Sequence, residues 1–187
     1  TLFESLRKSN LAAFKEKEVK EIIVTSPHCL TTFKQEYPGL DGEAKVIHLT
    51  QYLADLVEKG KLPLNKSLHK RIVYHDPCYL GRHNGIYEEP RRVLGSVPGV
   101  TLMDEVECRE NSLCCGGGGG RIWMETVKGQ RFSDILVEQA VEMGADILVT
   151  ACPYCLLNFK DSVVTSGKAD VLQVKDISEV VLEAMGD

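Results

Sequence analysis

Five cysteines between residues 78 and 155 constrain what the chain can fold into. They occur as a single Cys78, an adjacent pair, Cys114 and Cys115, and a spaced pair, Cys152 and Cys155. The gaps between these three groups are 35 and 36 residues. A thiolate is a soft ligand, and four or more in one chain are typical of a zinc site or an iron–sulfur cluster. The sequence therefore predicts that three distant segments meet at a metal centre.

A run of five glycines follows the adjacent pair and begins with Gly116 and Gly117. Neighbouring thiolates can reach one metal centre only if the backbone turns sharply, and glycine adopts positive φ at little cost. The amides of Gly116 and Gly117 are therefore expected to bind the cofactor by donating to its sulfur atoms. A phosphate-binding loop is a poor alternative, because the run follows cysteines rather than a strand.

The cysteines lie in three short motifs, at residues 75–78, 113–120 and 152–155. With these separations they resemble the CCG, or cysteine-rich, domain of the B-type and D-type subunits of heterodisulfide reductase, most closely the D-type branch. The resemblance implies an oxidoreductase that passes electrons to a disulfide. It also implies a noncubane [4Fe–4S] cluster as cofactor, with all five cysteines as ligands: Cys78, Cys114, Cys115, Cys152 and Cys155.

Two other functions fit the same residues. Related iron–sulfur subunits of glycolate, lactate and electron-transfer-flavoprotein oxidoreductases relay electrons in flavoprotein:quinone systems, with no substrate at the cluster. A structural zinc module is the third interpretation, because four thiolates complete a tetrahedral zinc site. Zinc is expected above all in recombinant or air-exposed protein.

Part of the chain repeats itself. Residues 22–29 resemble residues 147–155, but the first copy has Ser26-Pro27-His28-Cys29 where the second has Cys-Pro-Tyr-Cys, and so lacks one ligand. We interpret residues 1–60 as the rear half of a first, degenerate CCG domain, residues 61–69 as a linker, and residues 70–187 as a complete second CCG domain. The chain then represents a C-terminal fragment of a longer protein.

Four further residues are candidates for the site. His28 and Cys29 are expected near the metal centre if the two copies pack with equivalent strand ends facing each other, where a histidine can exchange a proton with a released thiolate. His75 flanks Cys78 and is a third catalytic candidate, through a hydrogen bond to a ligand thiolate. Arg82 is expected to offset the negative charge of the thiolates. Cys108 lies outside the pattern and is predicted to be an ordinary thiol.

Strands alternate with helices along the chain, which predicts an α/β fold of Rossmann-like parallel sheets with helices on both faces. Ligands in such sheets bind beyond the carboxyl ends of the strands. Trp123 is expected in the core, and Thr50 as a helix cap. The expected strands are residues 21–26, 45–49, 71–74, 100–103, 147–150 and 171–174; the expected helices are residues 2–18, 27–37, 50–59, 77–82, 88–96, 122–143, 153–162 and 177–185.

Composition and net charge limit the partners and the cellular compartment that we expect for this chain. A net charge of −5 without a basic stripe argues against a nucleic-acid partner. An odd number of cysteines, seven, and the absence of a signal peptide favour a reducing cytoplasm over a secreted disulfide scaffold. The expected partners are other redox subunits or a ferredoxin-like segment upstream, and a flavoprotein or quinone-linked membrane protein. No apolar run reaches the ~20 residues of a membrane span, so membrane association is expected only through parts outside this chain.

Overall fold

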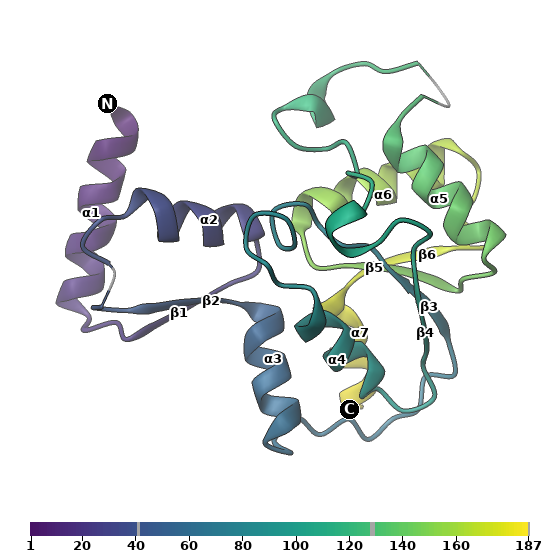
Figure 1. The fold of residues 1–187 in the computed structure, drawn as a ribbon, viewed down its shortest axis with the longest axis horizontal. Helices are drawn as coiled ribbons and strands as arrows, with labels where there is room; N and C mark the ends of the chain where they lie inside the picture. Colours follow the sequence, from purple (N-terminus) through teal and green to yellow (C-terminus); the bar gives the residue numbers. More distant parts are fainter. Residues whose placement is uncertain (41, 128–129, 187) are drawn as a thin grey trace.

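The computed structural model of the chain describes residues 1–40, 42–127 and 130–186. It contains two parallel sheets, which confirms the predicted α/β class (Figure 1). The smaller pairs β1 (Glu21–Val24) with β2 (Lys45–His48). The larger has the order β4-β3-β5-β6, from strands β3 (Arg71–Tyr74), β4 (Thr101–Asp104), β5 (Ile147–Thr150) and β6 (Gln173–Asp176).

Helices cover both faces of the larger sheet, as expected. Alternate residues of a strand point to opposite faces, so Ile72 and Tyr74 of β3 belong to one hydrophobic core and Val73 to another. The first core also contains residues of α4 and α7, and the second contains residues of α5 and α6. The helices are α1 (Leu2–Glu16), α2 (Pro27–Glu36), α3 (Leu49–Glu58), α4 (Glu88–Gly95), α5 (Phe132–Glu142), α6 (Pro153–Thr165) and α7 (Ile177–Met185).

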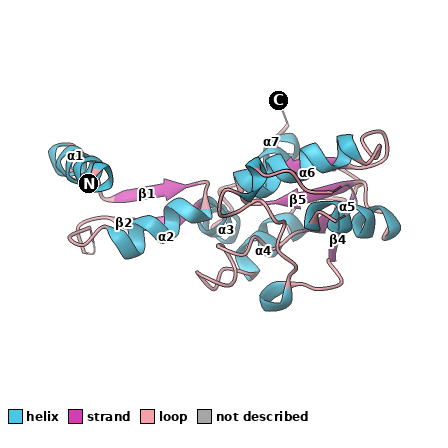
Figure 2. Cartoon of the chain, turned by 90° about the horizontal axis from the view of Figure 1, so that it is seen from above, coloured by secondary structure: helices cyan, strands magenta, loops and turns pink. Residues whose placement is uncertain are grey.

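The two sheets share a core through α3. Leu53 and Ala54 of α3 are buried in the same cluster as Val93 and Leu94 of α4. Helix α1 lies at the opposite end of the smaller sheet, far from α4 (Figure 2). It buries no residue, and its Leu2 is 76% exposed. The smaller sheet is therefore joined to the larger one through α3, whereas α1 at its other end contributes no buried residue.

Several predicted boundaries were wrong. The helix expected at 122–143 begins only at Phe132, and residues 128–129 of it lie outside the described residues. Trp123 is 84% exposed rather than in the core, since it ends a single 3₁₀ turn, Arg121–Trp123, and the next residue, Met124, is extended instead of helical. The helix expected at 77–82 is replaced by turns over residues 78–84. The last strand begins at Gln173 instead of residue 171, because the amide of Val171 still bonds to the carbonyl of Lys168 in a turn.

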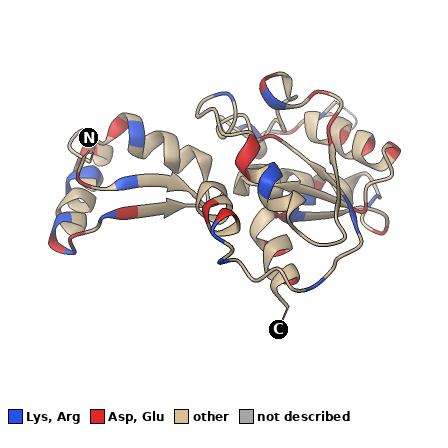
Figure 3. Cartoon of the chain, turned by 60° about the horizontal axis from the view of Figure 1, so that its bottom comes forward, with Lys and Arg blue, Asp and Glu red and all other residues tan. Residues whose placement is uncertain are grey.

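Charged residues of both signs are distributed over both parts of the molecule (Figure 3). Within the part of the chain that the structure describes, no helix combines the length and the apolar character that a membrane crossing requires.

A buried histidine caps the amino end of α3. His48 Nδ1 accepts a hydrogen bond from the Thr50 amide at 3.3 Å, and Nε2 lies 3.1 Å from the Thr25 carbonyl oxygen. The predicted cap, Thr50, lies inside the helix, which begins at Leu49. Burial disfavours the charged ring and lowers the pKa of His48 to about 4. Protonation would also remove the lone pair that accepts from Thr50, so the cap works only with a neutral ring.

We expect His48 to make the protein less stable in mild acid. The pKa of an unfolded histidine is about 6.5, so between pH 6.5 and pH 4 the unfolded chain binds more protons than the folded one. The stability that the neutral ring contributes is complete above this window and is lost as the pH falls through it. The two pKa values give a loss of about 2 kcal/mol at pH 5.

Urea unfolding at pH 7.5 and pH 5 measures this loss. The matched control is His48→Asn, which keeps a capping side-chain oxygen but has no titrating ring. Its loss between the two pH values should be smaller than that of the wild type by about 2 kcal/mol. Equal losses in the two proteins would contradict the assignment.

Candidate metal centre

The cysteines come together because neighbouring parallel strands end at the same edge of the sheet. Strands β3 and β5 are paired in parallel, so the segments after their carboxyl ends bring Cys78 and Cys152 to the same edge of the sheet. Cys155 lies in the first turn of α6, directly after β5. Strand β4 also pairs with β3 in parallel, and the loop beyond it carries Cys114 and Cys115.

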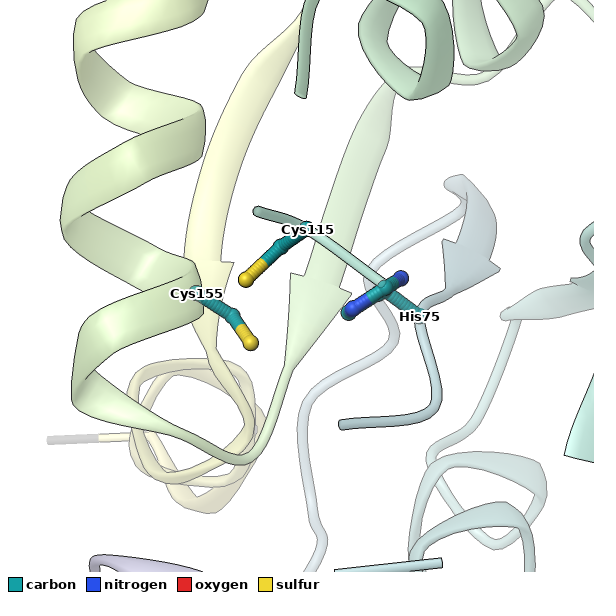
Figure 4. Close-up of side chains that lie close together, drawn as sticks. All are labelled: His75, Cys115 and Cys155. Carbon is teal, nitrogen blue, oxygen red and sulfur yellow. The ribbon is translucent and has the colours of Figure 1, made fainter. Parts of the chain in front are cut away.

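Contacts between sulfur atoms link the whole group, which we call the five-cysteine group. Cys114 Sγ lies 4.0 Å from Cys78 Sγ. The sulfur atoms of Cys115 and Cys155 and a ring nitrogen of His75 all lie within 4.8 Å of one another. Figure 4 shows these three side chains converging from three different segments. Cys115, Cys152 and Cys155 are buried, whereas Cys78 and Cys114 are half-buried.

The thiols share protons along this chain of contacts. Hydrogen bonds from Cys114 and Cys155 are the largest causes that lower the pKa of Cys115. A hydrogen bond with Cys114 lowers the pKa of Cys78 to about 6, and one with Cys155 lowers that of Cys152 to about 5. The same bonds raise the pKa values of Cys114 and Cys155. Metal ligands must be deprotonated, and three of the five positions already favour the thiolate.

Two glycine amides support the adjacent cysteines. Gly116 N–H donates to Cys114 Sγ at 3.4 Å, and Gly117 N–H donates to Cys115 Sγ at 3.5 Å. Gly116 has a φ of 80°, which a residue with a Cβ rarely adopts. A Cβ on Gly117 would lie 3.4 Å from the Tyr154 carbonyl oxygen. The glycines thus allow the sharp turn that lets consecutive amides reach the two sulfur atoms.

His75 lies behind the sulfur atoms and is fully buried. Its Nδ1 is 3.0 Å from Glu105 Oε1, and Phe159 packs edge-on at a centroid distance of 4.8 Å. Burial disfavours the charged ring, but the Glu105 carboxylate and the Cys115 thiolate outweigh it and raise the pKa of His75 to about 10. The ring therefore favours the positively charged form beside the thiolates.

Arg82 holds two cysteine loops together. Its guanidinium donates to the Ser112 carbonyl oxygen at 2.6 Å, which ties the Cys78 loop to the segment before Cys114. The pKa of Cys78, lowered chiefly by the Cys114 hydrogen bond, is lowered further by the charge of Arg82. The expected offset of negative charge is thus accompanied by a structural contact that the sequence did not indicate.

Helix α2 brings His28 to the five-cysteine group. A hydrogen bond with Cys152 raises the pKa of His28 against the effect of burial. Its ring stacks on Tyr79 at 4.0 Å and meets Tyr154 at 5.0 Å. The neighbouring Cys29 is exposed. Of the two candidates from the first copy, it is His28 that contacts the thiols.

Cys108 lies apart from these contacts. It is half-buried, and its sulfur atom is 3.7 Å from the Arg109 guanidinium. Among the described residues, the sulfur contacts of the five-cysteine group do not include it.

Sequence reasoning missed a buried ion pair beneath the Cys78 loop. Arg91 of α4 makes two hydrogen bonds to Asp76, at 2.8 and 2.6 Å, and a third to Asp104 at 2.7 Å. Asp76 also accepts from the Arg109 amide at 2.8 Å. A local signal was present, since Arg91 lies on the buried side of the helix, adjacent to the buried Pro90 and one turn before the buried Leu94. An arginine on a buried face needs an anionic partner.

Comparison with known proteins identifies the kind of domain. A model of the CCG family, described as a cysteine-rich domain, matches residues 1–34 and 72–160. The chain therefore belongs to the cysteine-rich CCG domain family, and the resemblance predicted from the motifs is confirmed.

The chain is similar to three kinds of curated relative. It is 38% identical to the probable iron-sulfur-binding oxidoreductase FadF of Bacillus subtilis, over 98% of this chain and 26% of the relative. It is 39% identical to the EtfAB:quinone oxidoreductase of Syntrophomonas wolfei, over 98% and 27%. It is 38% identical to the D-type subunit of the dihydromethanophenazine:CoB–CoM heterodisulfide reductase of Methanosarcina barkeri, over 97% and 44%. The chain thus spans between about a quarter and less than half of these relatives.

An iron–sulfur cluster is supported by the family, by the names of these oxidoreductases and by the donor set itself. Five cysteine side chains, all soft potential ligands, come together in this group, and backbone amides donate to two of their sulfur atoms. Such sulfur-directed amides are a usual feature of iron–sulfur sites. The residues present fit the cofactor.

Proposed function

We propose that this chain is the iron–sulfur electron-transfer domain of a heterodisulfide-reductase-like oxidoreductase that reduces a disulfide. The observation that carries the proposal is the continuous chain of sulfur contacts through Cys78, Cys114, Cys115, Cys155 and Cys152. These five residues would hold the cluster, and the amides of Gly116 and Gly117 with the charge of Arg82 would stabilise the thiolates. A bound cluster would supply electrons one at a time.

The cluster is proposed to be the noncubane [4Fe–4S] type. Adjacent Cys114 and Cys115 support this, because each has its own amide donor and its own sulfur neighbour, and so the two can bind different irons. Zinc is the competing occupant, since Cys115, Cys155 and His75 already lie close enough to share one ion.

His28 is the proposed proton donor and acceptor. Reduction of one disulfide consumes two electrons and two protons and releases two thiols. The His28 ring contacts Cys152 and lies where α2 meets the Cys78 loop, so it can pass a proton to a thiolate released there. His75 is fully enclosed and is proposed to act on the ligand thiolates rather than on substrate. Cys29 is proposed to contribute only as an exposed thiol near this junction.

A relay in a flavoprotein:quinone system is the second candidate, and the EtfAB:quinone oxidoreductase relative favours it. In that case no disulfide reaches the site. The proposed partners are other redox subunits or a ferredoxin-like segment upstream, with a flavoprotein or a quinone-linked membrane protein beyond them. The proposed location is the cytoplasm, with membrane association through parts outside this chain.

We infer that residues 1–60 are the rear half of a first CCG domain, joined by residues 61–69 to a complete second domain at 70–187. The pair β1–β2 corresponds to β5–β6, yet β5 has β3 on its other side, whereas β1 has no second neighbour among the described strands. Ile23 of β1 is 41% exposed. A strand equivalent to β3, from preceding residues, would complete this edge. In a longer chain the β1 amides should then exchange hydrogen more slowly than in this one; equal exchange would count against the inference.

Metal analysis with electron paramagnetic resonance (EPR) tests the proposed function. The anaerobically purified protein should contain iron and sulfide and give a paramagnetic signal. With a reduced viologen dye as donor, it should consume disulfides with two electrons each, and His28→Gln should slow turnover at unchanged iron content. Zinc without iron would contradict the function. Reduction of a quinone-linked acceptor without disulfide turnover would establish the second candidate instead.

A further inference from the structure

A buried carboxylate lies on the far side of His75 from the five-cysteine group. Glu105, in the loop after β4, is only 5% exposed. Its two oxygens lie 3.0 and 3.1 Å from His75 Nδ1, and Ser112 Oγ is 3.5 Å from one of them. A carboxylate is costly to bury unless it is paired and hydrogen-bonded. The pair with His75 compensates this cost and at the same time fixes the ring.

The contact decides which ring nitrogen is available to the sulfur atoms. Nδ1 is hydrogen-bonded to Glu105, so only Nε2 is available to the sulfur atoms. Nε2 is buried and has no other hydrogen-bond partner among the described residues. Figure 4 shows one ring nitrogen directed toward Cys115 and Cys155 and the other turned away. Phe159 packs against the ring edge-on and restricts its rotation. Without Glu105, Phe159 would still restrict the ring, but no contact would determine which ring nitrogen faces the sulfur atoms.

We propose that Glu105 is a positioning residue of the metal centre, which holds His75 so that Nε2 faces Cys115 and Cys155 and thereby raises the reduction potential of the cluster. The inference rests on the proposed iron–sulfur function and goes beyond it by adding a residue that binds neither metal nor substrate. A donor aimed at ligand sulfur stabilises the more negative, reduced cluster, and outer partners orient such donors. Glu105 therefore acts on the potential through the orientation of one ring.

The test is an EPR-monitored redox titration of the anaerobic, cluster-containing protein. Glu105→Met removes the acceptor at similar volume and should shift the midpoint potential to more negative values. Glu105→Gln keeps a hydrogen-bond partner for Nδ1, because its amide NH2 can donate to the neutral ring and leave the proton on Nε2, so it should retain most of the wild-type potential. The matched control is Glu107→Gln, an exposed glutamate two residues away, which should leave the potential unchanged.

A double substitution separates action through His75 from a direct charge effect. In a His75→Asn background, Glu105→Met should cause no further shift, because the ring it positions is absent. A shift as large as in the wild-type background would overturn the proposal, as would an unchanged potential in the single variant. If the protein binds no iron, the proposed function fails and this inference fails with it; iron binding with an unresponsive potential overturns the inference alone.

A measurement on the wild-type protein covers the case in which the Glu105 variants do not fold. With ¹⁵N-histidine, pulsed EPR of the paramagnetic cluster should detect a weakly coupled histidine nitrogen. The coupling should persist in His28→Gln, which removes the other neighbouring ring, and vanish in His75→Asn. Absence of any histidine coupling in the wild type would overturn the proposal.

Discussion

Cys115→Ala is expected to abolish cluster binding. Cys115 is 3% exposed and lies in the middle of the five-cysteine group, in contact with Cys114 on one side and Cys155 on the other. Removal of this side chain breaks the chain of sulfur contacts in the middle. Cys114 and Cys155 then lose the thiolate to which both donate a hydrogen bond. Iron and acid-labile sulfide per protein should fall to background, and the visible absorption of the cluster should disappear.

Two matched substitutions show whether the loss is specific. Cys108→Ala and Cys29→Ala each remove a thiol outside the group, and both should retain the iron content and spectrum of the wild type. Unchanged iron in Cys115→Ala would end the five-ligand assignment. A large loss in Cys108→Ala would show that a ligand has been assigned to the wrong cysteine.

The sequence predicted that these cysteines would meet, because both of the signals used are local. Short apolar strands alternating with helices indicate a parallel sheet, and Cys78 and Cys152 come shortly after the ends of two such strands. In a parallel sheet the ends of neighbouring strands meet. That step required no knowledge of side-chain packing. The structure then added the contacts between the sulfur atoms.

The residues that support the centre could not be predicted from the sequence, because their contacts join segments far apart in the chain. Glu105 meets His75 across 30 residues of chain, and no periodicity marks it. Asn158 donates to the Cys115 carbonyl oxygen at 2.5 Å across 43 residues, from a helix face whose other buried residues include Cys155 and Phe159. The start of α5 was also misplaced, because the apolar residues that indicated this helix lie at 135–143 and do not mark where it begins. Apolar content alone cannot distinguish a buried helical face from an exposed segment such as that around Trp123.

The largest effect on stability is expected from Arg91→Met. The Arg91 side chain is 8% exposed and compensates Asp76, which is 2% exposed. Removing one partner of a buried ion pair leaves the other charge uncompensated, which costs about 3–5 kcal/mol. Urea unfolding followed by circular dichroism measures this cost. Because Asp76 lies two residues before Cys78 and also holds the Arg109 amide, the variant should bind less iron as well.

The neighbouring residue provides the control. Arg92→Met removes an arginine from the same helix, but its ion pair with Glu58 is exposed, with side-chain exposures of 46% and 55%. Exposed pairs contribute about 0–1 kcal/mol, so this variant should unfold almost as the wild type does. If the cost of Arg91→Met comes from the uncompensated carboxylate, adding Asp76→Asn should restore part of the lost stability. A cost no larger than that of Arg92→Met would show that Asp76 tolerates burial without its partner and that other contacts hold the Cys78 loop.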